Sequence, residues 1–431
     1  MTRSAPIAER TAPPQAAASA EHALVQRRTL RLLFFTQIVS GVGVAIGASV
    51  GALLAADVAG VGLSGLAQSA LVVGAALFAI PATSIVQQRG RRPSLAAGYL
   101  VATIGAILVV LAALRDSVPL LFLGFFLFGG ATAANLQARY AATDLAPPQL
   151  RGRHLSLIVW ATTLGAVAGP NFARLAGVAV DDYGVPTLAG PFVFSALLFT
   201  LAATLLVLLL RPDPAVVARS THAAPDPSRA RPSMGEALRV VRAHAPARFA
   251  LGAVAAAHLV MVGVMAMTPV HIRSAGHDAA HTLRIVGIVI SFHIAGMYAF
   301  SPIFGWLTDR FGRRAVIHGG GALLLAACAV AATAGLDTTR IAAGLWLLGL
   351  GWSATMVAGS ALLTDSMSVE LRPAAQGLSD LTMGLAGAMA GALSGVIVHA
   401  RGYATLAVTA GLAGLALTVL AMLRTPAVTR D

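Results

Sequence analysis

Methionine and histidine recur at helical spacing in two apolar stretches of the sequence. Met261 and Met265 are four residues apart, and His293 and Met297 repeat that spacing in the next apolar stretch. Side chains four residues apart lie on one face of an α-helix. His258, three residues before Met261, joins the first face. If the two stretches are consecutive antiparallel helices, we expect these faces to meet near the middle of the bundle.

These residues form a soft and uncharged set of potential ligands. Thioether groups select Cu(I) over hard ions such as Mg²⁺, and neutral ligands avoid burying several negative charges in an apolar medium. After the initiator, methionine is confined to the second half of the chain, which gap-filling in a core would not require. The pattern predicts a copper site, with helix packing or a pocket for an organic solute as the alternatives.

The elements that carry these residues are long apolar helices. Hydrophobic residues make up 57% of the chain and charged residues only 11%, whereas soluble domains average about 25% charged residues. A helix of about 20 apolar residues crosses the hydrocarbon core of a bilayer. We therefore predict an all-α membrane protein with twelve spans, near residues 30–52, 62–87, 94–114, 118–138, 154–178, 190–210, 248–270, 283–305, 315–334, 341–363, 374–398 and 403–423.

The positive charge of the chain follows the sides of the membrane. The formal net charge is +13, and all 30 basic residues are arginine, which fits a bacterial genome of high GC content. With both termini placed in the cytoplasm, twenty-four arginines fall on the cytoplasmic side and six elsewhere. This is the positive-inside bias, so the charge indicates orientation and not nucleic-acid binding. We expect a multi-pass protein of the bacterial cytoplasmic membrane.

Polar segments divide the chain into two halves. Residues 1–29 are rich in Ala and Pro, and we predict a disordered cytoplasmic tail there. A six-span half follows over 30–211, then a cytoplasmic linker over 212–247 with a short amphipathic piece near 235–243. A second six-span half over 248–423 precedes a cytoplasmic tail at 424–431.

The two halves repeat the same loop motifs. Gly-Arg-Arg at 90–92 recurs at 312–314, after 222 residues, and Thr-Asp followed by Leu-Arg at 143–151 recurs at 364–372, after 221 residues. Two independent loops whose offsets differ by a single residue make chance similarity improbable. Parallel repeats of six spans are the plan of major facilitator transporters.

Residues 305–314 resemble the signature cytoplasmic loop of that superfamily. Acidic and basic side chains at helix ends can pair when the cytoplasmic side closes and separate when it opens. In the first-half copy, Gln87 and Gln88 replace the acidic and basic residues, so we expect a weaker gate there. The predicted gate residues are Asp309, Arg310, Arg313, Arg314, Asp144, Arg151, Asp365 and Arg372.

A closer resemblance is concentrated in residues 258–312. The Met-x-x-x-Met and His-x-x-x-Met pairs, with Thr268-Pro269, Gly276-His277 and Ser301-Pro302, resemble the CcoA-like copper transporter family of bacteria. Residues 376–380 extend this resemblance. It implies copper import through the Met/His pairs and delivery to cytoplasmic copper acceptors for cytochrome oxidase assembly. Relatives in that family move riboflavin, so the organic-solute alternative stays open.

Other polar residues are weaker candidates. His271, His277, Asp278 and His281 lie in the outer loop before the eighth span, where they could collect a cation or be solvated. Asp380 could carry a coupling proton or cap the eleventh span.

The fifth span carries further signals. Its Gly-rich segment at 165–170 is similar to a motif of drug–proton antiporters, but small residues there also favour close helix packing. Asn171 and Arg174 could face the cavity and contact an anionic substrate.

Several classes are excluded. The chain has no lysine and no Gly-x-x-x-x-Gly-Lys loop, so it is no Walker-type ATPase. The single cysteine, Cys328, forms no internal disulfide, and no polar segment is long enough for a catalytic domain. We predict a non-enzymatic secondary transporter without a cofactor, embedded in lipid and importing copper by alternating access. The alternatives are an importer of riboflavin or a similar organic solute, a proton-driven drug exporter, and a membrane-embedded sensor or assembly factor.

Overall fold

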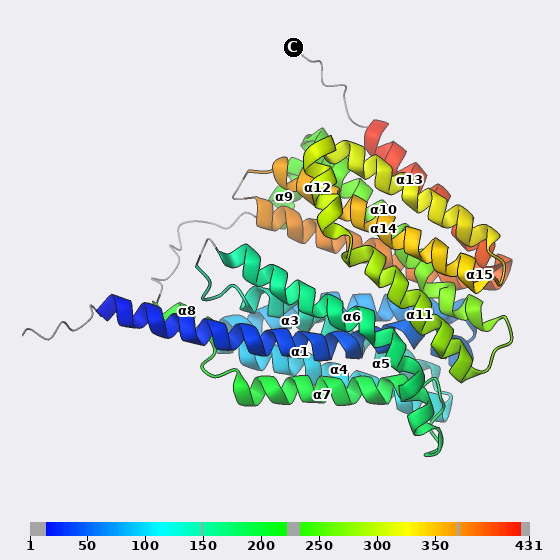
Figure 1. Cartoon of the computed structure of the whole chain (residues 1–431), viewed down its shortest axis with the longest axis horizontal. Helices are drawn as coiled ribbons and strands as arrows, with labels where there is room; N and C mark the ends of the chain where they lie inside the picture. Colours follow the sequence, from blue (N-terminus) through cyan, green and yellow to red (C-terminus); the bar gives the residue numbers. More distant parts are fainter. Residues whose placement is uncertain (1–13, 148–149, 222–232, 369–370, 424–431) are drawn as a thin grey trace, which may run out of the picture.

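The computed structural model describes residues 14–147, 150–221, 233–368 and 371–423, which are helical and contain no strand. The predicted tail at 424–431 and the first thirteen residues lie outside this part of the chain. Figure 1 shows the helices as two bundles, one blue to green and one green to red. The predicted all-α architecture is confirmed.

The N-terminal half contains six long helices and one short one. Their bounds are α1 Pro14–Ala59, α2 Val61–Ser64, α3 Leu66–Arg89, α4 Arg91–Arg115, α5 Val118–Ala141, α6 Arg151–Asp181 and α7 Gly190–Leu209. The linker carries α8 Pro214–Thr221 and α9 Met234–Ala243. The C-terminal half contains α10 Ala245–Arg273, α11 Ala279–Tyr298, α12 Ser301–Phe311, α13 Arg313–Thr333, α14 Thr338–Asp365 and α15 Arg372–Leu423.

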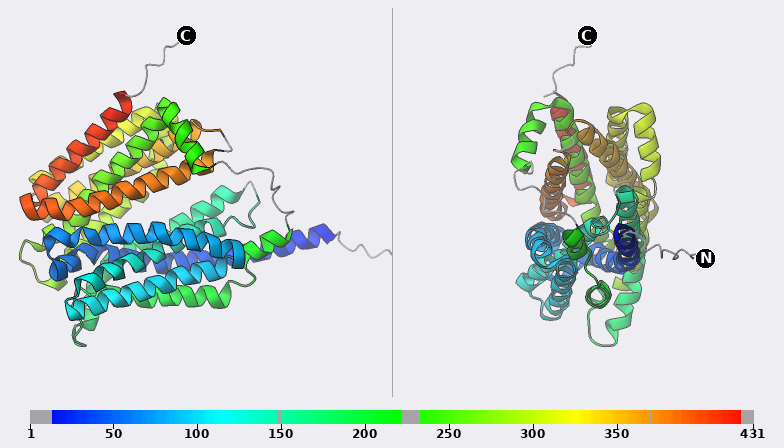
Figure 2. Two further views of the ribbon diagram at one scale, coloured as in Figure 1. Left: turned by 180° about the vertical axis from the view of Figure 1, so that it is seen from behind. Right: turned by 90° about the vertical axis from the view of Figure 1, so that its left-hand side faces the viewer.

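Eleven helical segments of the described chain are long and apolar enough to cross a membrane. The last of them is interrupted at Gly402, whose φ of 82° is not helical. Figure 2 shows the chain reversing there, from its orange to its red length. Counted on both sides of this turn, α15 supplies the eleventh and twelfth of the predicted spans.

The eighth span is broken between α11 and α12. Pro302 has no backbone N–H to donate to the Tyr298 carbonyl one turn earlier. The Ser301 hydroxyl donates to that carbonyl instead, at 2.8 Å. The segment predicted as one span near 283–305 is therefore two helices joined at Ala299 and Phe300.

The first helix begins well inside the segment predicted to be a disordered tail. It starts at Pro14, and Gln26 is buried and donates to the Ala142 carbonyl at 2.7 Å. The structure differs from the predicted disorder over 14–29, where α1 continues as helix, and Gln26 is the polar side chain of this segment that finds a partner on the first half. Composition alone gave no sign of that partner.

The linker helix α9 confirms the amphipathic piece predicted near 235–243. Ser233 caps it by accepting a hydrogen bond from the Glu236 amide at 3.1 Å. Its apolar residues Ala237 and Val241 are buried in a small cluster with Leu378 of α15. The short helix α8 was not predicted.

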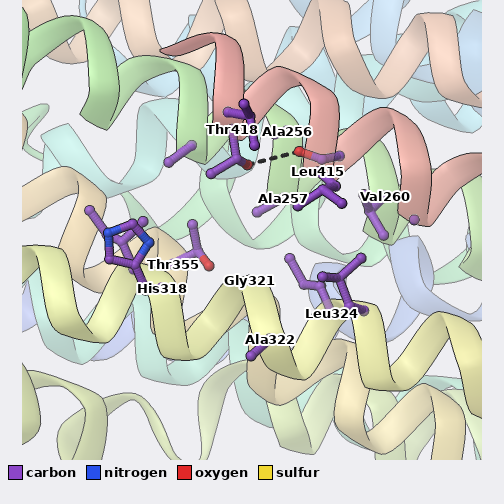
Figure 3. A pocket seen from close by; sticks show the side chains of 16 residues that line it. Ala256, Ala257, Val260, His318, Gly321, Ala322, Leu324, Thr355, Leu415 and Thr418 are labelled. Carbon is purple, nitrogen blue, oxygen red and sulfur yellow. Dashed lines mark hydrogen bonds between the residues drawn. The ribbon is translucent and has the colours of Figure 1, made fainter. Parts of the chain in front are cut away.

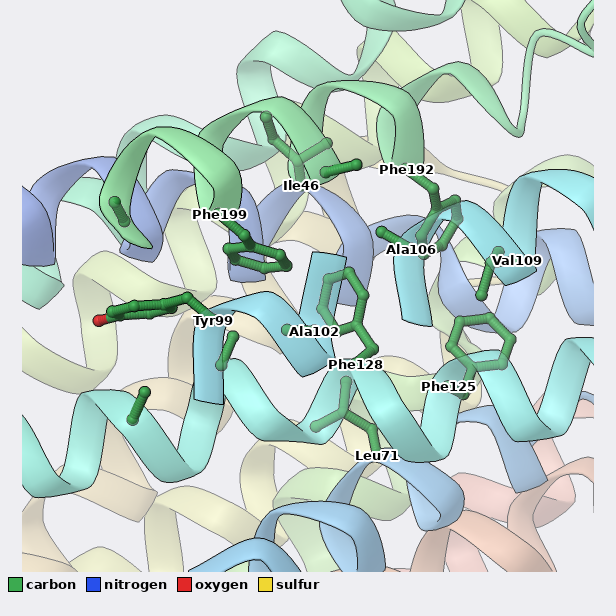
Figure 4. Close-up of a cluster of buried hydrophobic side chains, with 14 of the residues drawn as sticks. Ile46, Leu71, Tyr99, Ala102, Ala106, Val109, Phe125, Phe128, Phe192 and Phe199 are labelled. Atoms are coloured by element: carbon green, nitrogen blue, oxygen red, sulfur yellow. The ribbon is translucent and has the colours of Figure 1, made fainter. Parts of the chain in front are cut away.

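The core of the N-terminal half is built around aromatic rings. Figure 4 shows Tyr99, Phe128, Phe192 and Phe199 converging from α4, α5 and α7. The rings of Phe128 and Phe199 meet edge to face, with centroids 5.1 Å apart. Such contacts stabilise packing beyond the area that they bury.

Polar contacts join the two halves at one end of the bundle. They link Asp57 to Arg273, Ser64 to Met267, Ser69 to Ala388 and Asn171 to Ser291. Backbones also approach closely there, since a Cβ on Gly65 would lie 1.9 Å from the Gly391 carbonyl oxygen. In Figure 1 the halves meet on the right and diverge towards the left, where α8 and α9 lie. The arginine bias predicts that the joined end is extracellular.

Candidate substrate site

The three predicted methionine ligands share one apolar cluster of the second half. Met261 is 3% exposed and Met297 is 7% exposed, and both lie in a cluster that includes Leu345 and Trp352 of α14. Met265 packs against this cluster from a partly buried position. The methionines of α10 and α11 therefore lie in one cluster, as the meeting of the two helix faces predicted. Ordinary packing also produces such an apolar cluster.

His293 is fully buried and its ring is turned towards α14. Its Nδ1 lies 2.8 Å from the Leu345 carbonyl oxygen, so Nδ1 carries the proton in the neutral ring. Nε2 has no hydrogen-bond partner in the described part of the chain. A buried acceptor without a partner is costly, and this nitrogen is the atom of His293 that could bind a metal ion.

His258 belongs to a chain of aromatic contacts within the second half. Trp352 Nε1 donates to His258 Nδ1 at 3.1 Å. The Tyr298 ring meets the Trp352 ring edge to face, with centroids 5.9 Å apart. A Cβ on Gly387 would lie 3.0 Å from His258 Nε2, so this nitrogen faces α15.

A cavity of about 90 Å³ lies between the halves near Met265. Its lining from the second half is Met265, Ala266, Pro269, Ile290 and Ile294, and its lining from the first half comes from α1, α3 and α5. The polar side chains in this lining are Ser49 and Gln68. The Ser49 hydroxyl donates to the Ile46 carbonyl at 2.8 Å, so it offers the cavity an acceptor.

Four polar side chains from the two halves are grouped by the reach of the Arg139 charge, and we call them the inter-half set: Asn135, Arg139, Tyr298 and Asp380. The charge of Arg139 on α5 acts on both Tyr298 and Asp380 of the other half. Asn135 lies one turn before Arg139 on the same helix face. Asp380 is eight residues inside α15, so it is not the cap of that helix.

Sequence reasoning found Asp380 but missed the other three members of the set. Asn135 and Arg139 are four residues apart at the end of the predicted fourth span. Polar residues inside membrane helices are rare, and they usually mark a site. The four-residue interval between Asn135 and Arg139 was the signal in the sequence that could have identified these two residues as site candidates.

Asn135 is held by a buried hydrogen-bond network. Its Oδ1 accepts from the Tyr99 hydroxyl at 2.7 Å and from the Ser40 hydroxyl at 2.9 Å. Gln37 donates to the Tyr99 hydroxyl at 2.9 Å and accepts from Thr162 at 3.0 Å. The network fixes the carbonyl of the Asn135 amide towards the core of the first half, so its amino group remains for another partner.

The predicted gate residues pair within each half. Arg91 pairs with Asp144 at 2.8 Å, and both side chains are at most 15% exposed. Arg313 pairs with Asp365 at 2.9 Å and lies 3.8 Å from Asp309. The first-half loop has no acidic residue where the second has Asp309, but Arg91 still has an acidic partner. Its partner comes from the next loop, 53 residues later.

The other predicted gate residues have separate contacts. Arg310 lies over the Trp306 ring, 5.6 Å from its centroid, and Arg372 donates to the Thr364 carbonyl at 3.2 Å. Arg314 is exposed. The side chain of Arg151 lies outside the described residues.

The outer-loop histidines have structural contacts. His271 stacks on Tyr403, and its Nε2 lies 2.7 Å from the Gly335 carbonyl oxygen. The rings of His277 and His281 lie 4.6 Å apart, and Asp278 accepts from the His281 amide. Among the described residues, no group of three or more His, Cys, Asp or Glu side chains could hold a metal ion.

The fifth-span residues contribute to packing between helices. A Cβ on Gly165 would lie 2.5 Å from the Ile38 carbonyl oxygen, and the Pro170 carbonyl lies against Gly287 of the other half. Asn171 donates to Ser291 at 2.7 Å in the joined end of the bundle. Arg174 is exposed. These contacts favour the packing interpretation of residues 165–170.

Comparison with known proteins agrees with the fold over nearly the whole chain. The fold is similar to the crystal structure of a bacterial homologue of the human lysosomal transporter Spinster in an inward-facing, unoccupied conformation. The TM-score is 0.68 at 17% identity, and the similarity covers 93% of this chain and 95% of that one. The chain is 40% identical over 395 residues to the MFS-type transporter YdeG of Bacillus subtilis, covering 91% of this chain and 90% of the relative. It is 29% identical over 391 residues to the riboflavin transporter RfnT of Brucella anthropi, covering 89% and 92%.

The family model of the Major Facilitator Superfamily matches residues 32–288 and 276–431. The first match runs through the N-terminal half and the linker into α11, and the second covers the rest of the C-terminal half. With the repeat, the fold and the relatives in agreement, the chain belongs to the Major Facilitator Superfamily and is a secondary transporter.

Proposed function

We propose that this transporter takes up an aromatic, hydrogen-bonding organic solute of the flavin class by alternating access. The observation that carries the proposal is the inter-half set, because the charge of Arg139 on the first half acts on Tyr298 and Asp380 of the second half. A solute held by Arg139 on one half and Tyr298 on the other would contact both halves at once, as alternating access requires.

The chemistry of the set suits such a solute. Arg139 and the free amino group of Asn135 are donors for the carbonyl groups of a flavin ring. The Tyr298 and Trp352 rings offer faces and edges for stacking. The relative named as a riboflavin transporter is the support from comparison, at 29% identity over 391 residues.

Asp380 is the group that we assign to coupling. A carboxylate inside a membrane helix can bind and release a proton during transport. The Arg139 charge acts on it from the other half, so a solute that binds Arg139 would change the environment of the carboxylate. The arginine bias predicts that the diverging end of the halves faces the cytoplasm, which is the side of release for an importer.

Copper is the second candidate substrate. The observation in its favour is His293 Nε2, which is buried without a described partner, together with Met261 and Met297 in one apolar cluster. In this alternative, Cu(I) would be the cargo and cytoplasmic copper acceptors would receive it. The positions of two predicted ligands argue against copper. The Nδ1 hydrogen bond turns the His293 ring towards α14, whereas Met265 lines the inter-half cavity, whose lining does not include His293.

The two candidates separate in one preparation. The purified protein is reconstituted into liposomes, and uptake of labelled riboflavin and of Cu(I) is measured on the same vesicles. We expect saturable riboflavin uptake that Arg139→Gln reduces at least about tenfold, since a charge-assisted hydrogen bond contributes roughly 1.5–3 kcal/mol. Arg115→Gln is the matched control, because Arg115 is an exposed arginine at the end of α4.

Coupling is tested by counterflow. Asp380→Asn should abolish accumulation driven by a proton gradient but retain exchange of labelled for unlabelled solute.

Copper uptake without riboflavin uptake would reject the flavin proposal. Equal uptake by the Arg139→Gln and wild-type proteins would reject the role of the inter-half set.

A further inference from the structure

A larger cavity lies inside the C-terminal half. It measures about 210 Å³ and is lined by α10, α13, α14 and α15. Figure 3 shows Leu415 and Thr418 on one side and His318, Gly321 and Leu324 on the other. In Figure 1, α13 lies at the margin of the molecule that is remote from the N-terminal half, so this cavity is distinct from the inter-half cavity.

The cavity is a groove that opens on the membrane-facing surface. Leu325, Leu415 and Val419 line it and are also 38%, 44% and 39% exposed. Exposed apolar side chains in the middle of membrane-spanning helices contact lipid chains, because no water reaches that depth. The groove is therefore accessible from the bilayer.

The wall of the groove suits an alkyl chain. The hydroxyl groups of Thr355 and Thr418 donate to carbonyls of their own helices, at 2.9 and 2.8 Å, so their protons are not available to a ligand. The rest of the lining on α10 is Ala253, Ala256, Ala257 and Val260. Apart from His318 at one end, the lining offers a polar solute no hydrogen-bond donor to replace its hydration.

Basic groups lie at the cytoplasmic end of the same groove. Arg314, His318, Ala322 and Leu325 are four, four and three residues apart, so they form one stripe along α13. Arg314 and His318 are exposed. In the described chain, the nearby carboxylates of Asp309 and Asp365 pair with Arg313, not with Arg314.

We propose that this groove binds an anionic phospholipid of the cytoplasmic leaflet. One acyl chain lies in the groove along Gly321 and Leu325, and the headgroup phosphate contacts Arg314 and His318. Arginine is suited to phosphate because its planar guanidinium donates two parallel hydrogen bonds. The inference is independent of which solute the protein transports.

Two glycines of α13 supply a matched pair of variants. A Cβ on Gly319 or on Gly321 meets no heavy atom within 4 Å, so a side chain can begin at either position without a backbone clash. Only Gly321 lines the groove. Leucine is also a better helix former than glycine, so neither change weakens α13.

The experiment is a lipid titration of the full-length, delipidated protein by native mass spectrometry. The probes are phosphatidylglycerol, phosphatidylcholine with the same acyl chains, and water-soluble glycerophosphoglycerol. We expect one tightly bound phosphatidylglycerol, weaker phosphatidylcholine, and no comparable binding of the headgroup alone. Gly321→Leu should weaken phosphatidylglycerol binding by about tenfold, the equivalent of roughly two displaced methylene groups. Gly319→Leu should bind it as the wild type does.

Arg314→Gln should remove most of the preference for phosphatidylglycerol over phosphatidylcholine. Equal affinity of the Gly321→Leu and wild-type proteins would overturn the acyl-chain site. Equal affinity of the wild type for the two phospholipids would overturn the phosphate contact. Binding of glycerophosphoglycerol as tight as that of the lipid would assign the site to a free phosphate ester instead.

Discussion

The Arg91 guanidinium contacts the Asp144 carboxylate at two points, with Nε 2.8 Å from Oδ2 and Nη2 2.9 Å from Oδ1. Its remaining Nη1 donates to Gln137 at 2.9 Å. The corresponding arginine of the second half, Arg313, makes one short bond to Asp365, whose side chain is 52% exposed. The repeat therefore conserves the pairing in both halves but buries it only in the first.

This difference predicts a larger stability loss in the first half. Arg91→Ala leaves the buried Asp144 carboxylate without a partner and should destabilise the protein by about 3 kcal/mol. Arg313→Ala breaks an exposed pair and should cost less than about 1 kcal/mol. Thermal unfolding of both variants in detergent tests the order. The double variant Arg91→Ala, Asp144→Ala should recover part of the loss, and a larger loss in Arg313→Ala would contradict the assignment.

A second prediction concerns Asp213, which holds the start of α4. Its carboxylate accepts from the Arg91 amide at 3.1 Å and from the Arg92 amide at 2.7 Å. A negative charge at a helix N-terminus stabilises the helix by satisfying its free amides. Asp213→Ala should destabilise the protein by about 1 kcal/mol and speed hydrogen exchange at these amides. Asp337→Ala is the control, because Asp337 caps α14 instead, and equal exchange changes at α4 in both variants would argue against a local effect.

The third prediction concerns the joined end of the halves. Arg273 and Asp57 form an ion pair across the halves at 3.2 Å. Asp57→Asn should weaken this closure and increase the population of molecules that are open at that end. Spin-label distances between α2 and α15 measure the shift. The exchange variant Asp57→Arg, Arg273→Asp should restore the wild-type distances, and unchanged distances in Asp57→Asn would show that the pair does not hold the halves together.

The fourth prediction separates ligand sulfur from packing volume. Met→Leu removes the thioether while keeping size, and such swaps usually cost less than about 1.5 kcal/mol. If the substrate is a flavin, the double variant Met261→Leu, Met265→Leu should transport riboflavin at a near-normal rate.

If the substrate is Cu(I), the same variant should lose copper uptake and keep its expression level. Met389→Leu is the control, since this side chain is 53% exposed and lies outside the methionine cluster. Copper uptake that survives in the double variant would reject the thioether ligands.

Much of the fold could be predicted from local signals in the sequence. Apolar runs gave the spans, and the recurring loops at 90–92 and 312–314 gave the two halves. The break before Ser301 was missed because an apolar run continues through it, and only the missing N–H of Pro302 ends the helix. The helical start of α1 was missed because the partner of its buried Gln26, Ala142, is 116 residues away in sequence.

The site was harder to predict because spacing describes one helix at a time. The intervals at Met261 and His293 correctly placed side chains on helix faces, but they could not show that the His293 ring bonds to Leu345 of another helix. Arg139 illustrates the opposite problem. In the sequence it is one more positive residue near the cytoplasm, and only the fold brings Asp380 and Tyr298 of the other half within reach of its charge.

The break between α11 and α12 changes how the signature loop is attached to the membrane-spanning bundle. Asp309 and Arg310 are carried by an eleven-residue segment, Ser301–Phe311, and not by the rigid end of a continuous span. Ala299 and Phe300 keep right-handed helical dihedrals, so the break removes backbone hydrogen bonding without an extended linker. The signature loop is thus connected to the part of the span that carries His293 and Met297 through a point where the helix lacks the hydrogen bond that Pro302 cannot donate.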